Sequence, residues 1–530
     1  MKIELYCFLK KHTKKRFSKR SIIRNCPNTV GNGGYMTLFS CMLFLVLMGV
    51  IFLCLDGILI QEAHGRTKMA AVGAGEHLLA NYNEPLAKKY HVYFLDPRME
   101  RVMEKRADSY LKSTLIPTSS GLQRSSGLLN LQLVKVKVES FGSMQEQQCL
   151  YLRHQIKEFM KYDSTKDLLN GVIDTSTKQI YQQNQEVRDM KQLLDQKEEA
   201  KSQSEKETSQ NNAQNPSGEN PGDSAQSTQK NDPRAIIQKI IKHGVLEFVT
   251  SGESVSDQKI PTSSLPSKAQ KEKNQALPLN PFHSLSAMKE LLTEQELVSI
   301  SDKITKDGLT WPYIKKYFNS YVQGKKLDQT VLKYEMEYLL GGQETDRANL
   351  QYIVNRLILL RFSLNCVYAL KDQELNVQAL SLATSLVGFT GIVPVIEGVK
   401  YTILGAVSFG EALLDVKNLL SGQKIPILKN KTNWNLSVQG LAQIQNKKGN
   451  SSKTGIGYED YLMILLLLQT KSNRTYLRML DLMQVNIQKE QPDFLIQQCR
   501  FGVRIESQFA VKTWFAHGTY QLLQNRAFSY

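Results

Sequence analysis

The longest uninterrupted apolar stretch of the chain lies near its amino terminus. From Gly33 to Asp56 the sequence reads GGYMTLFSCMLFLVLMGVIFLCLD, and Tyr35–Leu55 is a run of twenty-one residues without a charge. At a rise of about 1.5 Å per residue, such a helix spans roughly 30 Å, the thickness of the hydrocarbon core of a bilayer. The pattern therefore predicts a transmembrane helix over residues 35–55.

A cleavable signal peptide is the alternative interpretation of this run. A signal has a shorter apolar region that is followed directly by a small-x-small cleavage site. Here the apolar run continues into DGILIQEAHGRTK, and the small residues Ala70–Gly75 lie too far beyond its end. We therefore expect an uncleaved anchor.

The helical pattern continues beyond the apolar run. No proline occurs from Tyr35 until Pro85, and Asn81–Pro85 is the first strong stop signal, so one helix of up to about 50 residues is expected. Its outer half is rich in residues that allow close helix packing: Gly57, Ala63, Gly65, Ala70, Ala71, Gly73, Ala74 and Gly75. These residues are expected to pack either against the chain's own globular domain or against another subunit.

Three segments have the pattern of strands. Tyr90–Asp96 (YHVYFLD) is a short aromatic and β-branched run. Leu133–Ser140 (LVKVKVES) alternates three valines with charged residues, and Phe501–Thr513 (FGVRIESQFAVKT) alternates over a longer stretch. Alternation with a period of two predicts half-buried strands, and the last segment predicts a strand or a hairpin pair.

Other segments have helical periodicity. Apolar residues recur at helical spacing from Leu152 to Met160 and more weakly on to Leu194, and again from Leu350 towards Val367. Tyr334–Leu340 ends at Gly341–Gly342, a helix stop, and Tyr461–Leu468 is too short to span a bilayer and predicts a core helix. Ala379–Ile396 is uncharged for eighteen residues but is diluted by Ser, Thr, Gly and Pro, so we expect a buried helix pair rather than a second span.

The domain organisation follows from these patterns. From Asp195 to Pro233 the chain has no Leu, Ile, Val, Met or aromatic residue, so this segment is expected to be a disordered polar insert; Ser251–Pro281 is expected to be a surface loop. We predict an α+β protein in which a long transmembrane helix extends into a helix-rich ectodomain with a small antiparallel sheet. Its expected parts are a basic tail (1–34), the transmembrane helix (35–55), the first part of the ectodomain (56–194), the insert (195–233) and the main part of the ectodomain (234–530).

The positive charge is concentrated beside the apolar run. The formal net charge is +17, and residues 1–34 contain nine Lys or Arg and one acid. A basic flank of this kind marks the cytoplasmic side of a span and attracts anionic lipid headgroups. A nucleic-acid-binding arm is disfavoured because the segment has no interleaved aromatic pattern and no binding fold behind it. We expect the amino terminus inside and residues 57–530 outside.

The cysteines do not form a disulfide framework. Of seven, only Cys149, Cys366 and Cys499 lie in the expected ectodomain, an odd number at wide spacing. This usage fits the exterior of a bacterium that does not rely on disulfides better than an oxidising secretory lumen. Four N-glycosylation sequons would matter only in a eukaryotic protein, where the anchor and tail would suggest a type II Golgi transferase, but the Asp-x-Asp motif that many such enzymes use is absent.

No catalytic motif is present. The eight histidines are spread singly, and there is no HExxH, CxxC, GxSxG, Walker loop, or GxGxxG after a strand. Glu397, Glu411 and Asp415 lie in the apolar carboxy-terminal region, and the last two share a helix face, where paired carboxylates can bind a cation or act as acid and base. The other interpretation is a polar rim on a packed helix, with Lys417 offsetting the charge. We expect no catalytic, cofactor-binding or metal-binding residues.

Two parts of the chain carry a resemblance. The stretch GYMTLFSCMLFLVLMGVIFLCLDGILIQEAHGRTKMAAVGAGEHLLANYNEPLAKKYHVYFLD resembles the amino-terminal region of TadE/TadG-like minor pilins of tight-adherence (Tad/Flp) systems. It is closer still to an uncharacterised family of large membrane-anchored proteins of Gram-positive bacteria that are encoded near such systems. LKYEMEYLLGGQETDRANLQYIVNRLILLRF, VGFTGIVPVIEGVKYTILGAVSFGEALLDVKNLLSGQKIP and GYEDYLMILLLLQTKSNRTYLRMLDLMQVNI resemble that family's carboxy-terminal part.

The resemblance implies context rather than chemistry. It implies a non-enzymatic, cell-surface accessory or minor pilin-like component of a Tad-type apparatus, with membrane lipid, other membrane proteins of the apparatus and cell-wall polymers as partners and no nucleic acid. One feature departs from pilins, because processing after Gly34 would place Phe39 where pilins have a docking glutamate. The alternative is a membrane-tethered cell-wall hydrolase or wall-binding protein that uses Glu411 and Asp415.

Overall fold

The computed structural model describes residues 33–99, 101–115, 130–162, 232–261, 264–269, 308–323, 330–447, 455–468, 473–515 and 518–530. Residues 1–32 of the predicted basic tail, the weak helical periodicity after Tyr162 and the predicted polar insert up to residue 231 lie outside these residues. The last two residues of the predicted tail, Gly33 and Gly34, are described and begin the first helix. The last two residues assigned to that insert are described, and they begin a helix: the side chain of Asp232 caps it by accepting from Arg234 N at 2.9 Å, and Pro233 is its first residue.

The chain divides into two compact units. Unit 1 consists of Met1–Thr67, Ser119–Gln132 and Phe509–Leu522, and unit 2 consists of Lys68–Thr118, Leu133–Gln508 and Leu523–Tyr530. The first helix and the three strands contribute residues to both units. The fold is α+β, as the sequence predicts.

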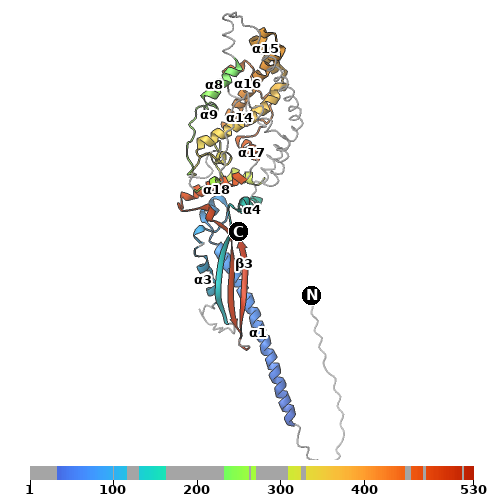
Figure 1. Ribbon diagram of the computed structural model, residues 1–530, viewed down its shortest axis with the longest axis vertical. Coiled ribbons are helices and arrows are strands. Elements are labelled where there is room, and N and C mark those ends of the chain that lie inside the picture. Colours follow the sequence, from blue (N-terminus) through green and yellow to red (C-terminus); the bar gives the residue numbers. More distant parts are fainter. Residues whose placement is uncertain are drawn as a thin grey trace, which may run out of the picture. The chain divides into compact units, whose positions relative to one another are not determined.

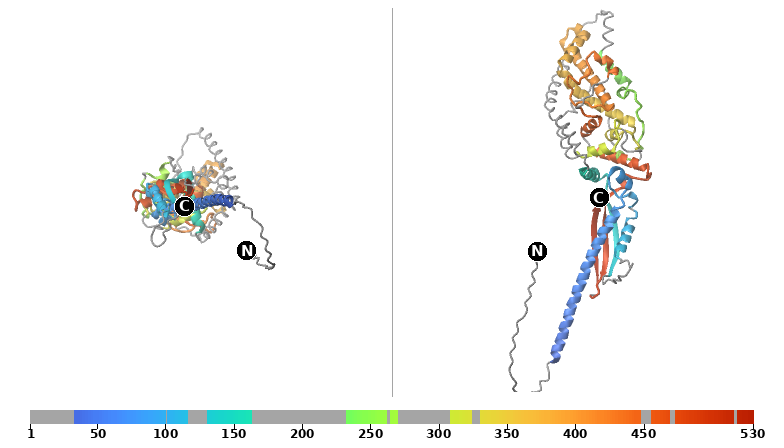
Figure 2. Two further views of the ribbon diagram at one scale, coloured as in Figure 1. Left: turned by 90° about the horizontal axis from the view of Figure 1, so that it is seen from below. Right: turned by 180° about the vertical axis from the view of Figure 1, so that it is seen from behind.

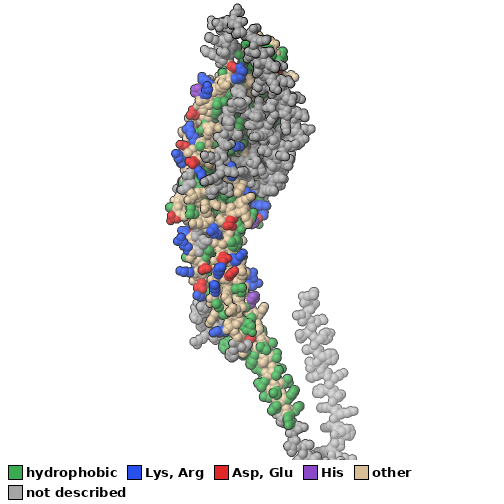
Figure 3. Space-filling view, in the orientation of Figure 1, with side chains coloured by type: hydrophobic (Ala, Val, Ile, Leu, Met, Phe, Trp, Pro, Cys, Tyr) green, Lys and Arg blue, Asp and Glu red, His purple; other side chains and the backbone are tan. Residues whose placement is uncertain are grey.

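The predicted long amino-terminal helix is confirmed. Helix α1 runs from Gly33 to Leu79, 47 residues, and ends just before the predicted stop at Asn81. In unit 1 its apolar side chains are largely exposed, for example Tyr35 at 79% and Leu53 at 66%, and they form the hydrophobic surface of α1 in Figure 3. In unit 2 the helix is partly buried through Ala70, Ala71, Ala74 and Leu78.

One three-stranded antiparallel sheet is formed in the order β1-β2-β3. Its strands are β1 (Asn130–Ser143), β2 (Arg500–Lys512) and β3 (Thr519–Ser529). The strands predicted over 133–140 and 501–513 are confirmed. Along the central strand β2 the predicted apolar positions Phe501, Val503, Ile505, Phe509 and Val511 are all buried. On β1, however, Val134 is 56% exposed, so the buried face is shorter than the alternation suggests.

The strand predicted over Tyr90–Asp96 is wrong. Tyr90 is instead the last residue of helix α2 (Glu84–Tyr90), which ends because His91 adopts a left-handed backbone with φ of 51°. The following residues are extended but make only isolated bridges, at Leu95 with Tyr82 and Arg500. Most of the run is therefore buried in unit 2 without a ladder of strand hydrogen bonds, while Tyr93 is 40% exposed.

The rest of unit 2 is helical. Its α-helices are α3 (Met103–Leu115), α4 (Glu146–Tyr162), α8 (Pro233–His243), α9 (Val245–Val249), α12 (Thr310–Tyr317), α13 (Glu335–Gly341), α14 (Asp346–Lys371), α15 (Gln373–Val387), α16 (Val393–Leu420), α17 (Tyr458–Leu468) and α18 (Asn473–Gln488). Short 3₁₀ turns are η1 (Pro97–Met99), η2 (Pro266–Ala269), η3 (Gly388–Thr390), η4 (Gly440–Asn446) and η5 (Ile496–Gln498). Helices α14 and α16 lie side by side (Figures 1 and 2).

The helices predicted from periodicity are confirmed in α4, α13, α14 and α17. Helix α13 stops at Gly342, which has a φ of 64°, as the Gly-Gly signal predicts. Helix α14 begins where Thr345 caps it by accepting from Ala348 N at 3.2 Å. The segment Ser251–Pro281 is non-helical where it is described, except for η2.

The uncharged run Ala379–Ile396 forms a helix pair, as predicted, but the pair is not buried throughout. Helices α15 and α16 pack together, whereas at their connection Phe389 is 88% and Val393 67% exposed. Hydroxyl groups in this segment donate hydrogen bonds to carbonyls of their own helix, for example Thr384 Oγ1 to Leu380 O at 2.9 Å.

Candidate functional site

The three carboxylates singled out from the sequence all lie on α16, but they do not form one group. Glu397 is near the start of the helix, 38% exposed at its side chain, and pairs with Lys400 at 2.6 Å. Glu411 and Asp415 lie four residues apart and are fully buried. Because fourteen residues of helix separate Glu397 from Glu411, the two are about 21 Å apart along the axis. The site is therefore built around Glu411 and Asp415 only.

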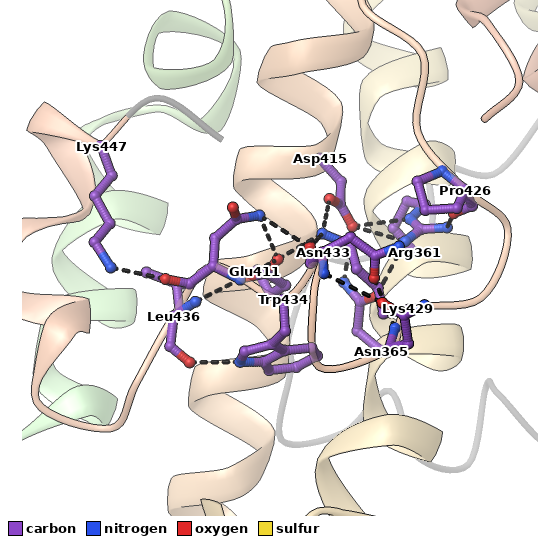
Figure 4. Close-up of polar contacts among 12 residues, drawn as sticks. Arg361, Asn365, Glu411, Asp415, Pro426, Lys429, Asn433, Trp434, Leu436 and Lys447 are labelled. Carbon is purple, nitrogen blue, oxygen red and sulfur yellow. Dashed lines mark hydrogen bonds and ion pairs between the residues drawn. The ribbon is translucent and has the colours of Figure 1, made fainter. Parts of the chain in front are cut away.

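Arg361 of α14 is the first partner of Asp415 (Figure 4). Its Nη2 lies 2.8 Å from Asp415 Oδ2, and its Nε donates to the same oxygen at 3.0 Å. The remaining donors of the guanidinium are also used: Asn365 and Tyr461 accept at 3.1 and 2.9 Å, and the carbonyls of residues 426 and 427 accept at 2.9 and 2.8 Å. A guanidinium with no exposed surface is thus saturated with acceptors, as burial of a charge requires.

Lys429 joins the two carboxylates. Its Nζ lies 2.5 Å from Glu411 Oε1 and 2.7 Å from Asp415 Oδ1, where it makes an ion pair without the angle of a hydrogen bond. Glu411 also accepts from Asn435 Nδ2 at 2.8 Å and from the backbone N–H of Leu436 at 3.0 Å. Two acids and two bases therefore neutralise one another inside unit 2. We call Arg361, Glu411, Asp415 and Lys429 the ionic cluster.

The charges of the cluster set its electrostatics. Burial opposes ionisation of Asp415, but Arg361 and Lys429 outweigh it and hold the pKa of this carboxyl below its ordinary value. Burial raises the pKa of Glu411, against the opposing effect of Lys429. A carboxylate that is enclosed by fixed cations and backbone donors is positioned to hold structure, and neither group presents a surface to a polymer substrate.

The ionic cluster holds the connection between α16 and η4. That connection, residues 421–439, contains long stretches without regular structure, so its backbone groups need partners from elsewhere. Arg361 Nη1 donates to the carbonyls of Pro426 and Ile427. Glu411 accepts from the backbone N–H groups of Asn435 and Leu436. The cluster thereby fixes an irregular segment onto two core helices.

The sequence indicated the acids but not their partners. Lys417, expected to offset their charge, lies over the Phe248 ring at 5.6 Å instead. Arg361 precedes Asp415 by 54 residues, a separation that no local spacing reveals. One signal was available: Arg361 interrupts the apolar run LILLRFSL in the middle of an amphipathic helix, and a charge there requires a buried partner.

A second pair of buried acids, Glu335 and Glu337, lies in the first turn of α13. Glu335 accepts from Asn319 N at 3.0 Å and Asn486 Nδ2 at 2.7 Å, and Glu337 accepts from Tyr321 N at 2.9 Å and Tyr458 Oη at 2.8 Å. Burial raises the pKa of each to about 7, because their hydrogen-bond donors are neutral. Among the described residues, no group of three or more His, Cys, Asp or Glu is arranged to hold a metal ion.

Helix α1 is the element with a surface suited to an environment other than water. It is long and apolar enough to cross a membrane, and none of its most hydrophobic window is buried. Helix α14 also passes this test by length and composition, but 67% of its window is buried, as is typical of a core helix. Among the described helices, α1 is thus the one that fits a membrane anchor.

Comparison with known proteins assigns the chain to a family but not to an activity. No curated protein and no solved structure matches it. A family model described as a family of unknown function (DUF5702) matches residues 223–511, which include the ionic cluster and the two buried acids of α13. Since this match covers more than half of the chain, the protein belongs to this family of unknown function.

Proposed function

We propose that the protein is a non-enzymatic, membrane-anchored accessory or minor pilin-like component of a Tad-type surface apparatus. Helix α1 crosses the cell membrane once, the basic tail stays in the cytoplasm, and the carboxy-terminal domain is extracellular. Its partners are membrane lipid, other membrane proteins of the apparatus and cell-wall polymers. The observation that carries the proposal is the change in burial along α1.

The apolar first part of α1 has the surface of a lipid-facing helix. Its side chains from Tyr35 to Leu55 are mostly exposed, and the first charge after them is Asp56. Lipid contact removes this apolar surface from water, which contributes a favourable free energy of about 25 cal/mol per Å². The nine basic residues of the tail favour the cytoplasmic side for the amino terminus.

The small residues of α1 fall into two groups that bear on subunit packing. A Cβ on Gly73 would meet Tyr110 Oη at 2.5 Å, and one on Gly75 would meet the Phe528 ring at 2.3 Å, so these glycines serve packing within unit 2. Gly57 and Gly65, in contrast, have nothing within 4 Å. Because an unneeded glycine weakens a helix by about 1 kcal/mol, this open face supports close approach by a helix of another subunit.

The interior of unit 2 supports a mechanical role. The paired carboxylates that the hydrolase alternative would use, Glu411 and Asp415, are buried and neutralised by Arg361 and Lys429. No observation on the described residues favours that alternative. On this proposal the carboxy-terminal domain has a structural role and not a catalytic one.

Leucine substitution at the open glycines tests the proposal. Gly57→Leu and Gly65→Leu, made together in the full chain, should leave membrane extraction and thermal unfolding unchanged while abolishing cross-links to other membrane proteins of the apparatus. Gly75→Leu is the matched control and should reduce thermal stability. Retention of every cross-link in the Gly57→Leu, Gly65→Leu variant would contradict an assembly role for this face.

The mature amino terminus provides an independent test. Mass spectrometry of the chain from native membranes should find Met1 for a plain anchor or Tyr35 for pilin-like processing. A start beyond residue 60 would mean a secreted product and would contradict the proposal.

A further inference from the structure

The turn between β2 and β3 carries two large aromatic side chains on its surface. The turn is closed by Thr513, whose N–H donates to Gly518 O at 3.0 Å and whose hydroxyl accepts from Gly518 N at 2.9 Å. Trp514 and Phe515 follow directly and are 53% and 39% exposed. Exposed apolar patches on a protein surface mark sites of contact with another protein or with a membrane.

This turn is attached to α1 at the end of the apolar run. The rings of Phe515 and Phe52 stack with centroids 4.3 Å apart and an interplanar angle of 5°. Asp56 Oδ1 accepts from the backbone N–H groups of Trp514 and Phe515 at 3.2 and 3.4 Å, and Asp56 is itself only 4% exposed. All these residues belong to unit 1.

The position of the turn along α1 indicates which medium contacts its two aromatic side chains. Phe52 is the eighteenth residue of the twenty-one-residue uncharged run, and Asp56 is the first charge after it. Leu53 and Leu55 beside them are 66% and 41% exposed, and about two turns later the surface becomes charged at the Glu62–Arg66 ion pair. The turn therefore lies at the level where a bilayer would change from hydrocarbon to headgroups, and there amphipathic Trp is preferred.

We propose that the β2–β3 turn is a second membrane contact of this protein, in which Trp514 and Phe515 insert into the headgroup region of the bilayer that α1 spans. Asp56 fixes the turn to α1 by binding its two backbone amides. Two attachments, one transmembrane and one interfacial, then restrict the rotation and tilt of unit 1 at the membrane. The inference rests on the proposed anchoring by α1.

Fluorescence quenching of the full chain in vesicles tests this contact. The protein is reconstituted into phosphatidylcholine–phosphatidylglycerol vesicles containing lipids brominated either near the headgroup or deep in the acyl chain. The difference between wild type and Trp514→Phe isolates Trp514 from the two other tryptophans, Trp311 and Trp434. We expect blue-shifted emission from Trp514 and a greater loss of emission with the shallow bromine than with the deep one.

A matched control places a tryptophan on another exposed aromatic position. Tyr162 is 88% exposed in unit 2, and Tyr162→Trp in the Trp514→Phe background should be quenched by aqueous iodide and unaffected by brominated lipid. Far-ultraviolet circular dichroism of each variant verifies folding.

The possible outcomes separate the inference from the anchor. If the chain floats with the vesicles while iodide quenches Trp514 as it quenches the control tryptophan, the inference fails and the anchor stands. If Trp514 is protected from both iodide and brominated lipid, a second protein copy covers the turn and the inference also fails. If the chain does not float, both the anchor and the inference are wrong.

Discussion

Replacement of Arg361 by methionine is the substitution whose effect the structure specifies most closely. Methionine keeps most of the volume but leaves Asp415 with the Lys429 charge and the Asn365 Nδ2 hydrogen bond at 3.0 Å. It also removes the donors to the Asn365 and Tyr461 oxygens and to the carbonyls of residues 426 and 427. Removing one partner of a buried ion pair typically costs about 3–5 kcal/mol, because the other charge stays buried. We expect a loss in this range in Arg361→Met.

Thermal unfolding of the full chain in detergent, followed by circular dichroism, measures the effect. At about 2–4 °C per kcal/mol for a domain of this size, the midpoint should fall by roughly 10 °C. Arg347→Met on the same helix is the control: Arg347 pairs with Glu247 at 3.6 Å on the surface, so its loss should change stability by less than about 1 kcal/mol.

A double variant tests whether the unpaired charge causes the loss. Asp415→Leu combined with Arg361→Met removes both charges of the pair, so the double variant should be less destabilised than the two single variants added together. If Arg361→Met unfolds within 1 °C of wild type, the ionic cluster does not hold the fold and this reasoning is refuted.

Three further predictions concern other parts of unit 2. Because burial raises the pKa of Glu337 from its ordinary 4.5 to about 7, the folded chain keeps a proton that the unfolded chain releases, so folding stability falls as pH rises between these values. Glu337→Gln should remove about 3 kcal/mol of this fall, and urea unfolding at pH 4.5 and pH 8 measures it; equal pH dependence in both proteins would contradict the assignment. Gly455→Ala places a Cβ 2.5 Å from the Ile425 backbone and should lower the unfolding midpoint, whereas Gly405→Ala, with open space around it, should raise it slightly; a neutral Gly455→Ala would contradict the packing. In the native state a thiol-reactive maleimide should leave three buried thiols unmodified, and modification before unfolding would show that they are accessible; they are Cys149, Cys366 and Cys499.

Local patterns predicted the elements with one strongly apolar face. Helix α14 and strand β2 each bury a regular set of side chains, so their periods were visible in the sequence, whereas helix α1 was predicted from its uninterrupted apolar run. Strand β3 was not predicted because it is mostly exposed on both faces and therefore lacks alternation. The strand prediction for Tyr90–Asp96 was wrong because the composition of this run is typical of a strand, whereas its backbone makes only single bridges, from Leu95 to Tyr82 and Arg500.

The candidate site was only half predictable for a related reason. The spacing of Glu411 and Asp415 on one helix face is local information, whereas their pairing with Arg361 and Lys429 depends on how α14 and the connection after α16 pack. The attachment of the β2–β3 turn to Asp56 joins positions more than 450 residues apart in sequence. Such contacts follow from the fold and cannot be obtained from spacing.

The anchoring and orientation of α1 are the central claim, and protease treatment of intact cells tests them most directly. With an epitope at the carboxy terminus, external protease should remove the epitope and leave an amino-terminal fragment that resists extraction by alkaline carbonate. An epitope that survives on intact cells but is digested after lysis, or a chain recovered in the soluble fraction, would contradict the claim.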